Sequence, residues 1–201
     1  PCPVIEANEV NDRAHDIWNI LRSDFPKRDY SILVKTTEGK SMLPCRMVTP
    51  QIIEELNNND EILSFVSMIP TNSTIIEKQD KTAWSLSTEI IQNNNGTNIE
   101  HALLFCNLLL GQNINAYVVL GNDMITGYDA YVLVIDDDKI DPHADDYLRS
   151  SEEKKKKVEN RSKEIIDIDR LTLYNPTNGR VYKIGNEDIT LFDISTVFNY
   201  K

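Results

Sequence analysis

The chain has 201 residues, and 40% of them are hydrophobic, which suits one large domain or one domain with an extension. It carries 32 Asp and Glu against 21 Lys and Arg, a formal net charge of -11. This balance argues against nucleic-acid binding and against docking on an anionic membrane, since both need a basic face. The sequence contains no stretch of about 20 apolar residues, so membrane insertion is not expected. Cys2, Cys45 and Cys106 are too widely spaced for a disulfide framework or a zinc site, so we expect a reducing, cytoplasmic compartment.

The first 70 residues predict mainly helices. Residues 8–24 predict a helix, because their apolar positions recur on one face. A strand is expected over 30–35, followed by a turn at Glu38-Gly39. Thr49-Pro50 predicts the start of a second helix, with the threonine as cap and the proline in the first turn. An asparagine tract interrupts this helix, and the apolar period resumes over 61–68.

The middle of the chain contains the clearest helix. A short helix is expected through Glu89 and Ile91, followed by a loop at 93–96. His101 to Leu110 is nearly all apolar and predicts a buried helix. Gly111 is expected to end it in the left-handed capping conformation.

The remaining elements are strands. Four segments are predicted, and the last two flank a five-residue turn typical of a β-hairpin: 114–120, 130–135, 171–174 and 180–184. Helices therefore come first, then one central helix, then a run of strands. This order predicts an α+β fold in which the central helix packs against an antiparallel sheet.

Two charged segments separate the second and third strands. The aspartates of residues 136–146 lack the alternating ligands and the glycine of a calcium loop, so a solvated acidic loop is favoured over a metal site. The run Lys154–Lys157 lies between glutamates, which favours a flexible charged insert over a basic docking site. We expect neither a metal nor a cofactor.

Short motifs in a fixed order carry a family resemblance. They are Gly96-x-Asn98 with Ala102-Leu103-Leu104, Leu110-Gly111 with Ala116-Tyr117-Val118, Asp129-Ala130-Tyr131-Val132 and Tyr174-Asn175-Pro176. Together they resemble the core of the transglutaminase-like, papain-related fold. Residues 100–111 are similar to the version found in centrosomal and ciliary C2-domain proteins.

The resemblance covers roughly residues 45–185 and sets the expected domain organisation. It implies a transglutaminase-like domain over 45–201 with a charged insert at about 136–164. Residues 1–44 are then either an N-terminal helical extension or part of the same domain.

The resemblance also implies where a catalytic triad would lie. In the family, a cysteine at the start of the central helix attacks a carboxamide, a histidine acts as base, and an aspartate orients the histidine. The matching positions here hold Asn98, Asp129 and Asn175. An amide cannot replace a thiolate nucleophile, and a carboxylate of ordinary pKa is a poor proton shuttle for a thiol. We therefore predict a pseudoenzyme without catalytic residues.

Two residues near these positions have alternative interpretations. Cys106 as a displaced nucleophile would make the chain an active cysteine peptidase or acyl transferase, but its apolar neighbours favour a buried core thiol. His101, one turn after Asn98, either lines the former cleft or makes a structural hydrogen bond near the helix start.

The resemblance implies a binding or scaffold module within a centrosome, basal-body or cilium protein, with a protein or peptide partner. The surviving cleft is expected to use six residues: Trp84, Asn98, His101, Asp129, Tyr131 and Asn175. A cleft filled by the chain's own side chains would instead favour a purely architectural role, holding neighbouring C2 or coiled-coil regions in place.

Overall fold

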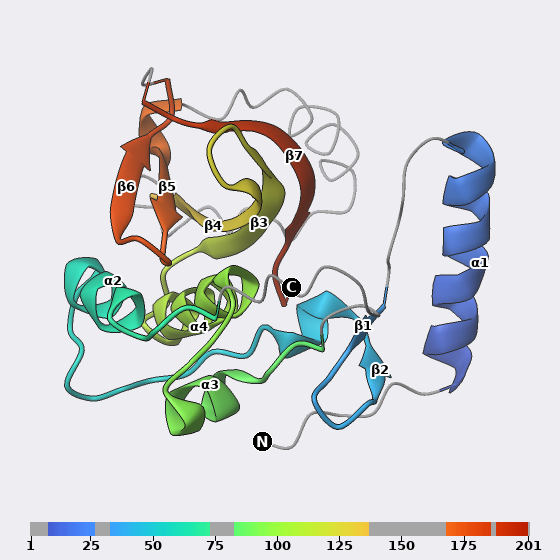
Figure 1. Ribbon diagram of the computed structural model, residues 1–201, viewed down its shortest axis with the longest axis horizontal. Coiled ribbons are helices and arrows are strands. Elements are labelled where there is room, and N and C mark those ends of the chain that lie inside the picture. Colours follow the sequence, from blue (N-terminus) through green and yellow to red (C-terminus); the bar gives the residue numbers. More distant parts are fainter. Residues whose placement is uncertain (1–7, 27–32, 73–82, 137–167, 186–187, 201) are drawn as a thin grey trace, which may run out of the picture.

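The computed structural model describes residues 8–26, 33–72, 83–136, 168–185 and 188–200. The predicted acidic loop and charged insert therefore lie, but for residue 136, outside the described residues, and so does Cys2. Figure 1 shows a curved sheet with helices on one side of it, and helix α1 (Asn8–Asp24) standing away from the sheet.

The sheet has five strands, all antiparallel to their neighbours. Their order across the sheet is β6-β5-β4-β3-β7, so β6 and β7 are its edges. Their bounds are β3 (Ala116–Asp123), β4 (Gly127–Ile135), β5 (Leu171–Asn175), β6 (Arg180–Lys183) and β7 (Leu191–Phe198). A separate two-stranded ribbon pairs β1 (Val34–Lys35) with β2 (Ser41–Met42).

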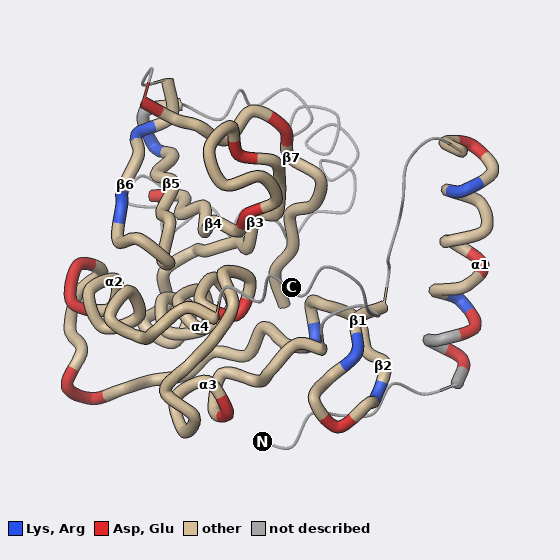
Figure 2. Tube along the Cα trace, viewed as in Figure 1, with Lys and Arg blue, Asp and Glu red and all other residues tan. Residues whose placement is uncertain are grey.

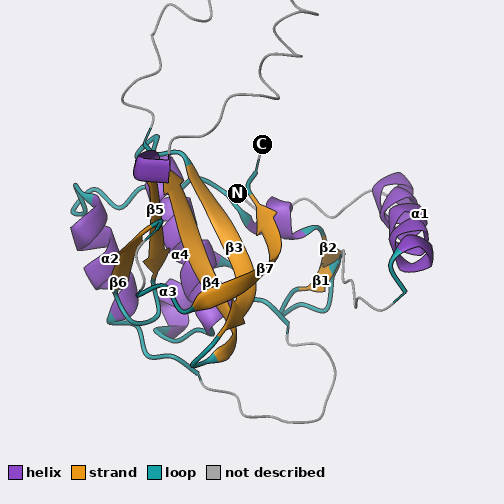
Figure 3. Ribbon diagram, turned by 90° about the horizontal axis from the view of Figure 1, so that it is seen from above, coloured by secondary structure: helices purple, strands orange, loops and turns teal. Residues whose placement is uncertain are grey.

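The central helix α4 (Asn98–Gly111) packs on one face of this sheet, as Figure 3 shows from above. It is buried nearly all round, because β3 and β4 cover one side while α2 (Asn59–Ser67) and α3 (Ser87–Asn93) cover others. A helix that is apolar on all faces is stable only in such a setting. The predicted α+β fold, with its central helix on an antiparallel sheet, is confirmed.

The two faces of the sheet support different clusters of side chains. On the α4 side, Val118 and Val132 join the main core with Phe105. The opposite face has a smaller cluster of four buried residues: Val119, Tyr131, Leu173 and Tyr182. The alternation of side chains along a strand separates these two clusters.

The prediction of a helix that starts at Thr49-Pro50 is wrong. Residues 48–58 are irregular, because Asn107 of α4 holds their backbone. The Asn107 side-chain oxygen accepts from Thr49 N at 2.9 Å, and its backbone oxygen accepts from Gln51 N at 2.9 Å. The asparagine tract then starts α2 instead of interrupting it: Asn58 caps the helix by accepting from Glu61 N.

Gly111 is also used differently from the prediction. It is the last residue of α4 and does not adopt the left-handed conformation, which occurs two residues later at Asn113. A Cβ at position 111 would lie 1.8 Å from the Gln51 backbone oxygen. The glycine is therefore required by close contact between two backbones, not by its own dihedral angles.

Strand β7 was not predicted. Its register against β3 shifts twice, between Leu120 and Gly121 and between Asn122 and Asp123. These irregularities remove the period-two hydrophobic pattern by which a half-buried strand is identified. Of the first predicted strand, the described residues contain only Val34 and Lys35 in β-structure.

Candidate functional site

The three residues at the predicted triad positions meet in space. Asn98 is the first residue of α4, Asp129 lies on β4, and Asn175 is the last residue of β5. The Asn98 side-chain amide donates to Asp129 Oδ1 at 2.8 Å, and the Asn175 amide donates to Asp129 Oδ2 at 3.4 Å. The order of contacts is thus 98 to 129 to 175, as in a nucleophile–base–orienter arrangement.

Local structure fixes the start of α4 beside β4. Thr97 caps the helix by accepting from Glu100 N, and the Glu100 carboxylate accepts from Thr97 N at 2.7 Å. Glu100 also accepts from Ser85 N at 2.5 Å, which ties the segment before α3 to the same turn. Asn98 is consequently held at the positive end of the helix dipole, facing the Asp129 carboxylate.

The Asp129 carboxylate is buried and has no acceptor capacity to spare. Besides the two amides, Oδ1 accepts from Ala130 N at 2.8 Å and Oδ2 accepts from the Thr126 hydroxyl at 2.9 Å. An ionised carboxylate offers about four acceptor positions, and four donors fill them here. The residue at the base position therefore holds neighbouring elements together through hydrogen bonds.

The two asparagines are equally engaged by the chain itself. The Asn98 oxygen accepts from Ile99 N at 2.9 Å, while its amide also reaches Tyr128 O at 3.3 Å. The Asn175 oxygen accepts from Thr177 N and Asn178 N and so shapes the β5–β6 turn. An amide nitrogen is not a nucleophile, and the hydrogen bonds that both asparagines make are structural.

A second carboxylate, Asp123 at the end of β3, adjoins this cluster. It accepts from the hydroxyls of Tyr131 and Thr190 and from the backbone N–H groups of Ile125 and Thr126. Burial alone would raise the pKa of Asp123, but these four hydrogen bonds together hold it well below its usual range. Burial and the hydrogen bond to Asp123 raise the pKa of Tyr131. Tyr131 belongs to the buried cluster on the face of the sheet opposite α4, and its hydroxyl links Asp123 to that cluster.

His101 and Trp84 lie in the interior. Both ring nitrogens of His101 face backbone oxygens, Thr97 O at 2.7 Å and Ile69 O at 2.9 Å, so its contacts are structural. The Trp84 ring stacks on Phe198 at a centroid distance of 6.4 Å. Of the six residues predicted to line the cleft, only Asn98 is partly exposed; their role in ligand binding stays a prediction.

The thiol considered as a displaced nucleophile is inaccessible. Cys106 is 0% exposed in the middle of α4, and burial raises its pKa to about 12. A thiol in that state has almost no thiolate near neutral pH. Cys45, in the 3-10 turn Pro44–Met47, is half-buried. The structure thus supports the core-thiol interpretation of Cys106.

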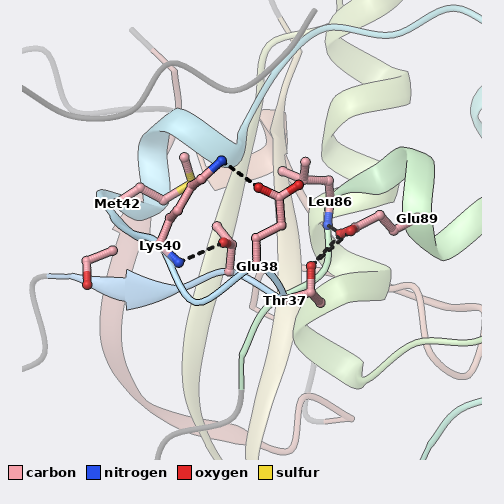
Figure 4. A pocket seen from close by; sticks show the side chains of 8 residues that line it. Thr37, Glu38, Lys40, Met42, Leu86 and Glu89 are labelled. Carbon is pink, nitrogen blue, oxygen red and sulfur yellow. Dashed lines mark hydrogen bonds and ion pairs between the residues drawn. The ribbon is translucent and has the colours of Figure 1, made fainter.

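A small cavity lies elsewhere, between the β1–β2 ribbon and the start of α3 (Figure 4). Thr37 donates to Glu89 at 2.9 Å across it, and Lys40 pairs with Glu38 at 2.6 Å beside it. Its volume of about 10 Å³ has room for roughly one water molecule, which is too little for a substrate. Among the residues that the structure describes, no group of three His, Cys, Asp or Glu side chains is arranged to hold a metal.

The residues that complete the polar network, Asp123, Thr126 and Thr190, were not predicted from the sequence. One signal was available. Asp123 lies two residues before Ile125 and three before Thr126, a spacing typical of a turn in which the aspartate side chain accepts backbone N–H groups. Nothing in the local sequence predicts the contact of Thr190, which lies 67 residues from Asp123 along the chain.

Comparisons with known proteins agree with the motif resemblance. A family model described as the CEP76 peptidase-like domain matches residues 82–201, the part that contains α3, α4 and the sheet. The human protein CC2D2B is 31% identical over 140 residues, which cover 64% of this chain and 10% of the relative. The chain therefore spans about a tenth of the length of that relative. No helix in the described part of the chain is long and apolar enough to cross a membrane.

Proposed function

Because the chain belongs to the family of the CEP76 peptidase-like domain, we propose that it is a catalytically inactive, peptidase-like module that acts as a protein-binding scaffold. One observation supports this proposal most strongly. The three triad positions are in contact, yet they contain two amides around one carboxylate whose four acceptor positions are filled. A site whose hydrogen-bonding groups are all paired within the chain stabilises the fold and leaves no group for proton transfer to a substrate.

The fold assignment forms part of the proposal. A helix starting at the nucleophile position, followed by antiparallel strands that supply the second and third positions, fits a transglutaminase-like or papain-like core. The replacement of all three functional groups then explains how such a core persists without activity. The network acts as a clasp that joins α4, β4 and β5.

The setting we propose is a centrosome, basal-body or cilium protein. The match to the peptidase-like domain and the similarity to human CC2D2B support the placement that the motif resemblance implies. The scaffold would act as one module of a longer protein and hold a protein partner. In cells, a fluorescent fusion of the chain should concentrate at the centrosome or basal body, and a diffuse distribution would argue against this setting.

Inactivity can be tested with the native cysteines. After brief treatment of the folded chain with iodoacetamide near neutral pH, mass spectrometry should find the half-buried Cys45 modified and the fully buried Cys106 protected. Unfolding in guanidinium chloride should make Cys106 react, which is the internal control. A folded chain in which Cys106 reacts faster than a free thiol would overturn the proposal, because activation of a thiol requires a lowered pKa.

A further inference from the structure

Strand β7 forms an open edge of the sheet. It is hydrogen-bonded to β3 on one side, and no described segment pairs with its other side. An edge strand presents a row of backbone donors and acceptors that can template another strand. Proteins often guard such an edge with lysine, proline or a β-bulge; the eight residues of β7 include neither lysine nor proline, and its two register shifts lie on the side that faces β3.

The side chains of this edge are unusually apolar for an exposed surface. Phe192 is 61% exposed and Ile194 is 58% exposed, and Val197 is also exposed. The β3–β4 turn continues the surface, because Met124 N donates to Thr190 O just before β7, and Met124 and Ile125 are both exposed. Contiguous exposed apolar side chains often mark an interaction site.

The edge is also held rigidly on the sheet. Gly121 of β3 approaches β7 so closely that a Cβ there would lie 2.1 Å from Asp193 O. The Ser195 hydroxyl donates to Leu120 O at 2.9 Å, and Asp123 fixes the adjoining turn through two backbone N–H groups. A surface that is already ordered loses little conformational entropy when a partner binds.

Charge is distributed unevenly across the sheet. Residues 116–135 and 191–198, which form β3, β4, their turn and β7, contain three aspartates and no lysine or arginine, and of these aspartates only Asp193 on β7 is exposed. Figure 2 shows red on β7 and blue on β6, the strand at the opposite edge of the sheet, which runs from Arg180 to Lys183. A segment that binds along β7 therefore meets the exposed Asp193 and no lysine or arginine of β3, β4 or β7, which favours cationic residues in that segment.

We propose that the outer edge of β7 binds an extended segment of a partner protein, in which apolar residues lie between lysines or arginines, as one further strand of the sheet. Backbone hydrogen bonds to the open edge supply affinity, contacts with Phe192 and Ile194 supply apolar burial, and the exposed Asp193 selects positive charge. This surface does not include Asn98, Asp129 or Asn175, so the inference stands independently of whether the triad positions are inactive.

The test uses the full chain and two labelled peptides with the same core of alternating valine and threonine. One peptide is flanked by lysines and the other by glutamates. At low salt, fluorescence anisotropy should show that the lysine-flanked peptide binds at least about tenfold more tightly than the glutamate-flanked peptide. Added salt should weaken the binding of the lysine-flanked peptide. On binding, amide hydrogen exchange should slow in β7.

Substitutions locate the site. Ile194→Lys should weaken binding of the lysine-flanked peptide at least about tenfold, since it adds an edge lysine where the apolar contact was. Phe192→Lys is a second variant in case Ile194→Lys disturbs folding, which circular dichroism would reveal. Val181→Lys, on the other edge strand at a side chain that is 46% exposed, is the matched control and should bind normally.

Three results would overturn the proposal. The lysine-flanked peptide does not bind, the glutamate-flanked peptide binds equally or more tightly, or amide exchange slows in β6 instead of β7. Equal effects of Ile194→Lys and Val181→Lys would do the same. A dimer in light scattering that Ile194→Lys abolishes would assign the edge to a second copy of the chain, which also contradicts a basic partner.

Discussion

At the scale of single residues, the notable feature is that the predicted triad positions make structural hydrogen bonds. Asp129 accepts four hydrogen bonds, and Asp123 accepts four others one strand away. Thr126 donates to both carboxylates, its backbone N–H to Asp123 and its hydroxyl to Asp129. The β3–β4 turn is thus linked to the start of α4 and to β5 by one continuous polar network.

Asp123 predicts a specific dependence of stability on pH. Its pKa is lower in the folded chain than the ordinary value of about 3.9, so its stabilising contribution is complete above that value and is lost as the pH falls below it. In urea unfolding between about pH 5 and pH 2, Asp123→Asn should therefore show a smaller loss of unfolding free energy than the native chain.

The exposed Asp193 on β7 provides the control for this titration. Asp193→Asn removes a carboxylate without touching the hydrogen bonds to Asp123, so the difference between the two variants isolates the effect of those hydrogen bonds. If Asp123→Asn and Asp193→Asn had the same pH dependence, the hydrogen bonds to Asp123 would not favour its charged form, contrary to the geometry.

The residues of the site were only partly predictable. Asn98, Asp129 and Asn175 could be located because each occupies a fixed place in a motif. The burial of Tyr131 and the distant hydrogen-bond partner of His101 could not, since both depend on how neighbouring backbone segments pack. His101, for instance, reaches Ile69 O, which is 32 residues away in the chain.

At the scale of elements, α4 organises both its own end and a segment far away. Asn107 holds the backbone of Thr49 and Gln51, and Gly111 lets Gln51 approach the end of the helix. These contacts explain why residues 48–58 are irregular despite a good helix-start signal at Thr49-Pro50. Local propensity yields here to a tertiary contact with an element 58 residues away.

Gly111→Ala should reveal this contact through the sign of its effect. In an exposed helix, the same change stabilises by about 1 kcal/mol. Here the added Cβ would overlap Gln51 O, so we expect a loss of about 1–3 kcal/mol in the free energy of unfolding, measured by urea denaturation. A neutral or stabilising Gly111→Ala would refute the close approach.

The elements with strong patterns were predicted well and the irregular ones were not. The apolar run of α4 and the hairpin around Pro176 have local signals that the tertiary structure reinforces. β7 has no such signal, because its side chains are exposed on both faces and its register is interrupted.

At the scale of the whole molecule, the β1–β2 ribbon is packed with the main core. Met42 is buried within that core, and Trp84 N donates to Lys35 O at 2.8 Å. Of the two alternatives for residues 1–44, these contacts favour the one in which residues 33–44 are part of the same domain. We propose that the folding unit begins before β1, at about residue 33.

Two truncations test this boundary. A chain that begins at residue 33 should fold with a cooperative unfolding transition. One that begins at residue 45 should lose about 2–5 kcal/mol or fail to fold, because it lacks Met42 and the partner of Trp84. Equal stability of the two chains, measured by urea denaturation, would place the boundary at residue 44 after all.

A double-mutant cycle on Asn98 and Asp129 tests most directly whether the former triad positions act as a structural clasp. Asn98→Ala, Asp129→Ala and the double variant are compared by equilibrium unfolding, with the exposed pair Asn122 and Asp193, joined at 3.2 Å, as a control of the same chemistry. We predict a coupling of about 1–2 kcal/mol for the buried pair and near zero for the exposed pair. Additive effects at Asn98 and Asp129 would contradict the clasp.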